Sequence, residues 1–150
     1  PSFGPILVLA VILVLLFLLW LAAAQVIYLA TLGPALPTSL TAFASDVLTT
    51  EAGWTMIILG MGVGGLFAAV VLTISVVSFP LLIDRPVGVA IAVGTSLRAV
   101  AANPGPMLVW GLIVAGGLLL GSIPAFLGLV IVLPVLGHAT WHLYRKVVAD

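Results

Sequence analysis

The amino-acid sequence predicts an all-α membrane protein: a four-span helical bundle with an outer amphipathic helix and a cytoplasmic elbow helix. Two observations predict this class. Hydrophobic residues make up 64% of the chain, charged residues only 5%, and the mean hydropathy is +1.47, whereas soluble domains carry roughly 25% charged residues. The apolar residues are also grouped into long stretches without charge, and such a chain needs lipid as its solvent.

The first span is expected at Phe3–Thr31, a stretch without any charged residue. Crossing the hydrocarbon core takes about 20 apolar residues, so this span should tilt or project. Gly33 and Pro34 predict its end. The next segment, Thr38–Thr50, has apolar residues on one helical stripe behind a Thr38/Ser39 cap and should lie along the outer surface.

The second span is expected at about Gly53–Phe79, with Pro80 closing it. Pro86–Ala102 is too short and too polar to span comfortably, so it is predicted to be an elbow helix in the cytoplasmic interface. Asp84 is its expected cap, with Pro86 in its first turn. Four residues are expected on its apolar face: Val89, Val93, Leu97 and Val100.

The third and fourth spans are expected at about Pro106–Gly121 and Pro124–Trp141. Asn103 is a suitable N-cap for the third span, with Pro104 in its first turn. Pro134 lies inside the fourth span and predicts a kink, because a proline removes one helical hydrogen bond.

The positions of the charges predict the orientation. The segment after span one carries only acidic groups, Asp46 and Glu51, whereas the chain's four cations follow spans two and four: Arg85, Arg98, Arg145 and Lys146. A four-span count places all four cations on one side, which the positive-inside rule makes cytoplasmic. Both ends of the chain are therefore expected in the cytoplasm.

Composition also limits the classes of function. With 150 residues the chain is expected to form a single transmembrane domain, and its net charge of zero gives no indication of a nucleic-acid partner. The absence of cysteine excludes disulfides, thiolate-bound clusters and cysteine nucleophiles within the chain. The sequence starts at Pro1 without a signal-peptide pattern, which indicates a processed chain or a piece of a longer one.

Glycines at helical spacing indicate close packing between membrane helices. Gly60 and Gly64 lie four residues apart in span two, and Gly117 and Gly121 lie four apart in span three. Small residues at this spacing let two backbones approach closely in lipid. The contacts are expected mainly within the chain, with packing against a lateral protein partner as the alternative.

His138 and His142 are one helical turn apart at the end of span four. One reading makes them ligands of a metal, haem or quinone, but no carboxylate or cysteine lies nearby in sequence to complete a metal shell. We favour interfacial anchoring without a cofactor, since aromatic and basic residues at a helix end are typical anchors. Those residues are Trp141, Tyr144, Arg145 and Lys146.

Nothing in the sequence predicts catalysis. Asp84 and Arg85 are interpreted as a cap and an orienting cation at the elbow, with Arg98 further along it. There is no nucleophile with a nearby base, no phosphate loop and no pair of carboxylates, so a non-enzymatic protein is expected. Spans without an ionisable residue at mid-membrane depth also disfavour transport by this chain alone.

Several motifs resemble a bacterial family of integral membrane proteins with a domain of unknown function. They are Thr50–Trp54, Ser75–Arg85, Asn103–Met107 and Gly137–Arg145. The last motif is the most specific one, and the resemblance covers Trp20 to the end of the chain. It implies the C-terminal portion of a longer protein in a bacterial inner membrane, and it carries over no catalytic residue.

Three readings of function follow. The first is an accessory or scaffold subunit that packs in the bilayer beside a larger membrane complex or a second copy of itself. The second is a haem- or quinone-associated subunit of a respiratory or photosynthetic complex. The third is a small-solute or lipid transporter, for which a polar tunnel would be required.

Overall fold

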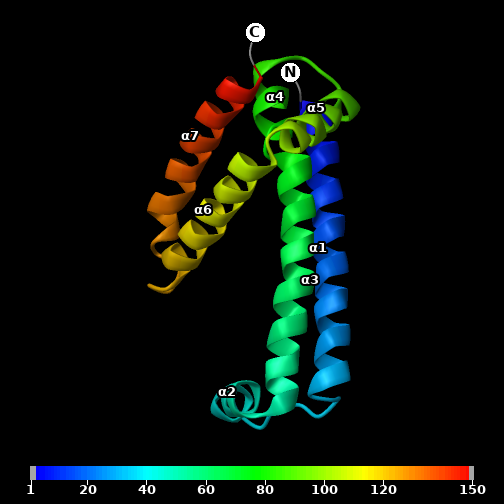
Figure 1. Ribbon diagram of the computed structural model, residues 1–150, viewed down its shortest axis with the longest axis vertical. Coiled ribbons are helices and arrows are strands. Elements are labelled where there is room, and N and C mark those ends of the chain that lie inside the picture. The colour runs from blue at the N-terminus through cyan, green and yellow to red at the C-terminus, as the bar shows by residue number, and fades with distance from the viewer. Residues whose placement is uncertain (1–2, 149–150) are drawn as a thin grey trace. The chain divides into compact units, whose positions relative to one another are not determined.

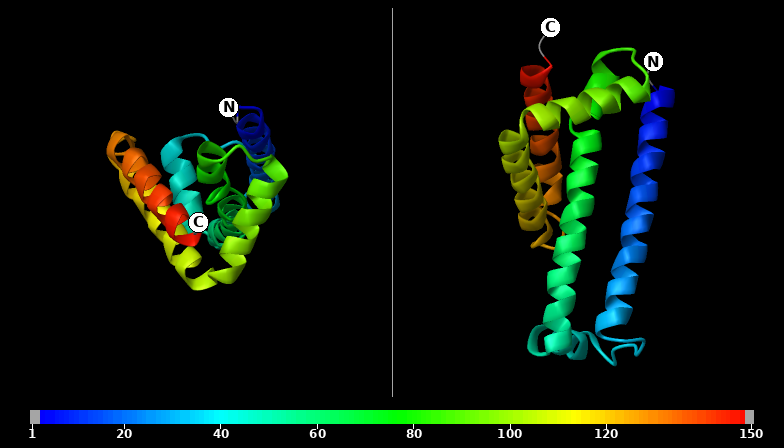
Figure 2. Two further views of the ribbon diagram at one scale, coloured as in Figure 1. Left: turned by 90° about the horizontal axis from the view of Figure 1, so that it is seen from above. Right: turned by 45° about the vertical axis from the view of Figure 1, so that its right-hand side comes forward.

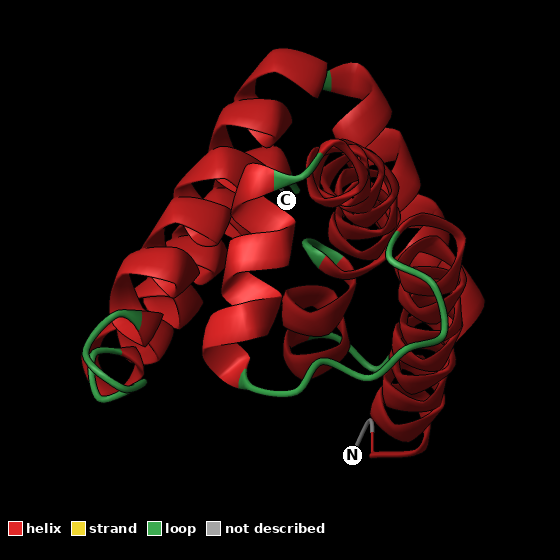
Figure 3. Ribbon diagram, turned by 90° about the horizontal axis from the view of Figure 1, so that it is seen from below, coloured by secondary structure: helices red, strands yellow, loops and turns green. Residues whose placement is uncertain are grey.

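The computed structural model describes residues 3–148, and this part of the chain folds into helices and loops without strands (Figures 1 and 3). The predicted all-α class is confirmed. The helices are α1 (Phe3–Thr31), α2 (Leu40–Thr49), α3 (Glu51–Ser75), α4 (Ser78–Asp84), α5 (Val89–Ala102), α6 (Pro104–Ser122) and α7 (Leu129–Val147). They form two compact units: unit 1 holds residues 3–10 and 71–148, and unit 2 holds residues 11–70.

Three segments among the described residues are long and apolar enough to cross a membrane: Phe3–Thr31, Glu51–Asp84 and Pro104–Ser122. They match the first three expected spans. The last of them, α6, begins with Pro104 at its first position, as predicted. The fourth expected span is not among the three, so the count of four stays a prediction.

Helix α7 begins later than the sequence suggested, at Leu129 instead of Pro124. Ala125 and Phe126 have φ angles of +49° and +67°. This left-handed conformation is costly for residues with a Cβ and interrupts a right-handed helix. The turn therefore covers residues 123–128, which shortens the apolar part of α7. Pro134 lies inside α7, as expected.

The second apolar segment is broken, but not at the predicted place. The interruption lies at Val76–Val77, between α3 and α4. Pro80 does not close the span: it occupies the first turn of α4, where a missing N–H removes no helical hydrogen bond. The chain then stays helical to Asp84. Asp84 is thus the last residue of α4 and does not cap α5, whose N-cap is Gly88.

Helix α5 exists, and its buried face agrees with the expected one only in part: Val93 and Val100 are partly buried and pack against the core. Ala92, Ser96 and Ala99 are buried, whereas Leu97 is 47% exposed. Small side chains on this face let α5 come close to the backbone of its neighbours, which the larger valines and leucine would prevent. Figure 2 shows α5 running crosswise to α6 and α7 within unit 1. Asn103 ends α5, and its side chain donates to the carbonyl of Ala99 instead of capping α6.

The Ser96 hydroxyl occupies the break between α3 and α4. In a continuous α-helix the N–H of Val77 would donate to the carbonyl of Thr73, four residues earlier. Here the Ser96 hydroxyl donates to the Thr73 carbonyl at 2.7 Å and accepts from the Val77 N–H at 3.2 Å. A side chain from α5 thus inserts into one rung of the helical ladder, a recognised cause of helix breaks.

The core of unit 1 surrounds this break. Ser96 is fully buried, and so is Ser78, whose hydroxyl donates to the carbonyl of Ile74. The buried hydrophobic side chains of this core come from the beginning of α1, from the break after α3 and from helices α4 to α7: Leu9, Val76, Val77, Leu81, Leu82, Ala92, Ala99, Met107 and Tyr144. Helices α6 and α7 lie side by side next to it (Figure 1).

In unit 2 the predicted helix at Thr38–Thr50 is present as α2, whereas its position on the outer surface stays a prediction. The Ser39 hydroxyl accepts from the Ala42 N–H, as an N-cap does. Thr50 joins α2 to α3: its hydroxyl donates to the Asp46 carbonyl at 2.6 Å and accepts from the Gly53 N–H at 3.0 Å. Gly53 is buried against α2, where an added Cβ would meet the carbonyl oxygens of Asp46 and Val47.

Replacement of Ser96 by alanine should destabilise unit 1. The change removes both hydrogen bonds at a fully buried position, which costs about 1–3 kcal/mol. Thermal unfolding in detergent should show a lowered midpoint for Ser96→Ala. The matched control is Thr95→Ala, since the Thr95 hydroxyl donates only to Ile91 within its own helix. Equal midpoints for the two variants would contradict a structural role for the inserted hydroxyl.

Replacement of Gly53 by alanine should loosen the α2–α3 corner. The methyl group would press on backbone oxygens, which cannot move as a flexible side chain can, and overpacking of this kind costs about 1–3 kcal/mol. Gly60→Ala is the control, because no atom lies within 4 Å of a Cβ at Gly60. Limited proteolysis of the α2 corner should accelerate in Gly53→Ala alone.

Candidate functional site

The polar cluster of unit 1 joins α4 to α7. Tyr144 donates from its hydroxyl to Oδ2 of Asp84 at 2.7 Å, and the Nε of Arg85 lies 3.6 Å from the same oxygen. Tyr144 is 2% exposed, whereas Asp84 and Arg85 are partly exposed. One carboxylate oxygen therefore faces a phenol from the core and a guanidinium from the surface.

This environment favours the neutral phenol. Burial raises the pKa of Tyr144 above its ordinary value of 10.0, and the hydrogen bond and charge of Asp84 raise this pKa further, while Arg85 opposes them. Tyr144 lies beyond Trp141, the expected end of the fourth span. At neutral pH its hydroxyl is thus a proton donor to Asp84, and it ties the end of α7 to the end of α4.

Tyr144 was expected to face the headgroup zone as an anchor, and the structure differs. Its ring is buried because the phenol has a carboxylate partner inside the fold, so it needs neither water nor lipid. Trp141 packs beside it, with 5.4 Å between the ring centroids. Arg145 and Lys146 are exposed in the last turn of α7, and Arg98 is exposed on α5; their interfacial role stays a prediction.

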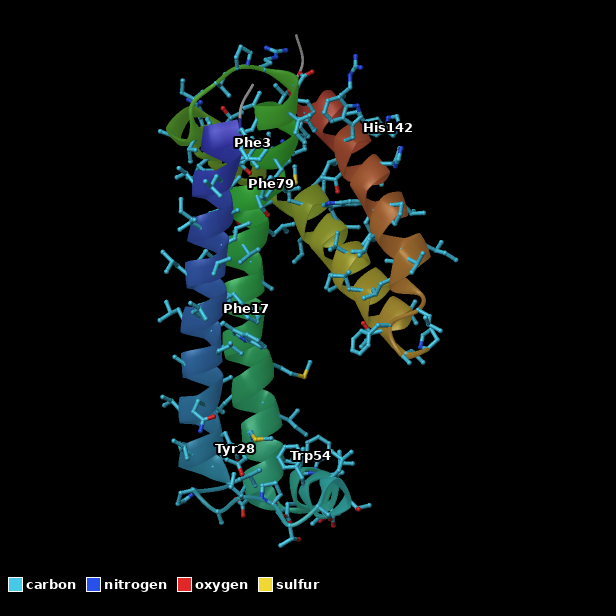
Figure 4. All side chains as sticks on the ribbon, turned by 180° about the vertical axis from the view of Figure 1, so that it is seen from behind. Phe3, Phe17, Tyr28, Trp54, Phe79 and His142 are labelled. Carbon is cyan, nitrogen blue, oxygen red and sulfur yellow. The ribbon has the colours of Figure 1, made fainter. Side chains whose placement is uncertain are left out.

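The two histidines lie on the exposed side of α7. His138 Nδ1 is 3.0 Å from the carbonyl oxygen of Pro134. A carbonyl only accepts, so Nδ1 is the donor in this contact. The side chain of His142 projects outward from α7 (Figure 4). Among residues 3–148 no group of three metal-ligating side chains gathers.

The two glycine pairs have different surroundings. A Cβ at Gly117 would lie 3.5 Å from Val132 Cγ1, and one at Gly121 would lie 2.8 Å from Leu129 Cδ2, so this pair faces α7. Gly128 reinforces the contact, because its Cβ would lie 2.8 Å from the Gly121 Cα. In unit 2 a Cβ at Gly64 would lie 3.5 Å from Trp20 Nε1, whereas Gly60 has open space beside it.

Sequence reasoning missed two features. The Tyr144–Asp84 bond joins residues 60 positions apart, and neither residue carries a local signal for the other. The second is a pocket in unit 2 between the end of α1 and α2, lined by Tyr28, Phe43 and Asp46 among others. Tyr28 and Phe43 come together at this pocket, but no local sequence pattern predicts that they meet.

Replacement of Tyr144 by phenylalanine should cost about 1–2 kcal/mol, because it removes a hydrogen bond to a partly exposed carboxylate and keeps the ring. The pKa of Tyr144 is raised in the fold, so its hydroxyl contributes fully below pH 10.0 and the contribution is lost as pH rises through the folded-state pKa. Thermal midpoints of the parent and Tyr144→Phe should therefore converge above that pKa. A constant gap from pH 8 to 12 would contradict this assignment.

The family model described as "Predicted integral membrane protein (DUF2189)" matches residues 2–84. No curated protein and no solved structure matches the chain. The expected family of membrane proteins with a domain of unknown function is therefore found, but its extent is corrected. The match begins before Trp20 and stops at residue 84, so the motifs Asn103–Met107 and Gly137–Arg145 lie outside it. Because the match spans more than half of the sequence, the chain belongs to the DUF2189 family of predicted integral membrane proteins.

Proposed function

We propose that this protein is a non-enzymatic accessory or scaffold subunit that packs beside a larger complex in a bacterial inner membrane. The observation that carries the proposal is the open glycine face of α3. In lipid, apolar surface alone does not drive helices together, whereas close backbone contact does. A face with small residues and no neighbour of its own is therefore suited to a second protein.

The open face is seen within unit 2. Of residues 11–70, all of which the structure describes, Gly53 is the one that is buried. Gly60 has no atom within 4 Å of a Cβ position, and large apolar side chains such as Ile58 and Met61 are 68% and 75% exposed. Lipid chains can cover these side chains, but a groove at a glycine suits the ridge of another helix better.

Gly60→Leu should weaken co-purification of a partner from membranes solubilised in mild detergent. The leucine fills the groove and holds the partner helix away. Gly62→Leu is the matched control, because Gly62 is also open but lies about 200° around the helix from Gly60. Both variants gain the same helix propensity. A difference in partner co-purification between them therefore shows which face of α3 contacts the partner.

Three outcomes are informative. Loss of the partner in Gly60→Leu alone supports the scaffold role and its face. Equal retention in both variants places the Gly60 face in lipid and overturns the proposal. A parent protein that purifies without any partner or second copy overturns it as well.

We also propose the four-span orientation with both described ends in the cytoplasm. Two observations support it. All four cations follow the second and fourth expected spans, and the Tyr144–Asp84 bond brings the end of α7 back to the end of α4. Helix α6 has 19 residues, or about 28 Å of helix, which is long enough to cross most of the hydrocarbon core, and the shorter apolar part of α7 packs along it.

Single cysteines at Ser45 and Thr95 should be labelled from opposite sides of the membrane. Ser45 lies on α2 and Thr95 on α5, on either side of the second expected span. A membrane-impermeant maleimide applied to intact cells should react with Ser45→Cys and not with Thr95→Cys. Labelling of both from outside would refute the orientation, and permeabilised cells provide the control for reactivity.

The histidines remain, in this proposal, interfacial groups without a cofactor. One observation favours the alternative of a haem- or metal-associated subunit: the Pro134 carbonyl fixes His138 with Nε2 free, as in many metal-ligating histidines. An absorption spectrum and elemental analysis of the purified protein distinguish the two readings. A stoichiometric haem or metal that is lost in His138→Ala would favour the alternative.

A further inference from the structure

A pocket in unit 2 combines aromatic, apolar and anionic walls. It lies where the end of α1, the loop after it and α2 meet, and it holds about 210 Å³. Figure 4 shows Tyr28 at this end of α1. The lining residues that matter here are Tyr28, Leu32, Leu36, Pro37, Phe43 and Asp46.

The two aromatic rings of the pocket belong to Tyr28 and Phe43 and lie close to each other. The centroids of Tyr28 and Phe43 are 6.4 Å apart and their planes are tilted by 46°, so neither ring stacks on the face of the other. The hydroxyl of Tyr28 donates to the Ala35 carbonyl at 3.0 Å, which fixes the ring against the loop. A cation within about 6 Å of an aromatic centroid is attracted by the ring quadrupole.

The charge at the pocket has one sign. Residues 11–70 contain Asp46 and Glu51 and neither lysine, arginine nor histidine. Within the described residues 3–148, no hydrogen bond or ion pair engages the carboxylate of Asp46; its backbone carbonyl accepts from Thr50. Asp46, an exposed residue, thus adds a negative charge to the residues that line the pocket, and unit 2 contains no cation to neutralise it.

We propose that this pocket binds the ammonium group of an organic amine. The carboxylate of Asp46 supplies the counter-charge, Tyr28 and Phe43 supply cation–π attraction, and Leu32, Leu36 and Pro37 contact the alkyl groups. Primary and quaternary ammonium groups occur both in phospholipid headgroups and in free amines, and the pocket chemistry is the same for either source. The proposal goes beyond the scaffold role and does not depend on it.

Other ligand classes fit less well. A divalent metal ion takes six or more oxygen ligands, and this pocket offers a single carboxylate among apolar walls. A phosphate or a carboxylate ligand would meet Asp46 without a compensating cation. An uncharged apolar ligand would leave that carboxylate beside it without any interaction.

The test is calorimetric titration of choline and of ethanolamine into the whole chain in phosphatidylglycerol nanodiscs. Titration into empty nanodiscs corrects for binding of the amine to the bilayer. Titration of sodium chloride corrects for the screening of charges by the added salt. Asp46→Asn should weaken binding by about threefold to fivefold, since an exposed ion pair contributes up to about 1 kcal/mol, which is about fivefold in Kd. The variant keeps the backbone carbonyl that Thr50 uses, so α2 retains its C-terminal contacts.

Two matched controls test the site. Glu51→Gln removes the same charge from the same unit, but Glu51 does not line the pocket. The affinity of this variant for choline and ethanolamine should therefore equal that of the parent. Phe43→Leu should weaken binding about threefold, whereas Phe17→Leu should not, because Phe17 packs on Trp20 elsewhere in α1. Equal losses in Asp46→Asn and Glu51→Gln, or no saturable binding of either amine, overturn the proposal.

The bilayer composition then identifies the source of the amine. If the occupant is a lipid headgroup, phosphatidylethanolamine nanodiscs should compete and weaken the apparent choline affinity relative to phosphatidylglycerol. If the occupant is a free amine, the two affinities should agree. Partner co-purification in Asp46→Asn should match the parent, which separates this proposal from the role of the Gly60 face.

Discussion

One hydroxyl determines how unit 1 is built. Ser96 takes the place of a single helical hydrogen bond between Thr73 and Val77, and it satisfies both backbone groups from a fully buried position. An unpaired N–H or carbonyl at such a depth would be expensive. The long apolar segment can therefore change direction at Val76–Val77, where no proline or glycine stands. Ala92 and Ala99, which lie about one helical turn before and after Ser96 on the same face of α5, allow α5 to come this close to the break.

The position of α5 has consequences for the rest of unit 1. The chain continues from α5 into α6. Helix α6 packs against α7 through the side that carries Gly117 and Gly121, and the backbones of Gly121 and Gly128 come close together. The returning α7 then places Tyr144 against Asp84. A hydrogen bond between these side chains is stronger here than in water, because the phenol is buried and one partner is charged. Three of the chain's four cations are sequence neighbours of the two bonded residues: Arg85 follows Asp84, and Arg145 and Lys146 follow Tyr144.

Unit 2 is organised differently. Its helices bury little against each other, and its contacts are a few ring pairs together with hydrogen bonds at the α2–α3 corner and in the loop after α1. Thr50 links the two helices through the Asp46 carbonyl and the Gly53 N–H, and Gly53 has no room for a side chain. The loop after α1 forms the pocket together with the end of α1 and with α2, and Tyr28, Phe43 and Asp46 are among its lining residues. A unit with so few internal contacts leaves most of its helical surface to lipid or to other proteins.

The sequence by itself determined the solvent, the helical class and the positions of three membrane-crossing segments, because uninterrupted apolar length and the caps around Ser39 and Pro104 are local signals. It also located the helix α2 correctly. Only the tertiary structure decided where the second segment breaks, since the cause is a serine 19 residues beyond Val77. The burial of Tyr144 was decided in the same way: a tyrosine near a basic helix end is typical of a lipid anchor, until a carboxylate 60 residues away becomes its partner. Periodicity reports which face of a helix is apolar, but it cannot report which distant polar group will meet it. For that reason α5 buried its small residues around Ser96 and left Leu97 outside.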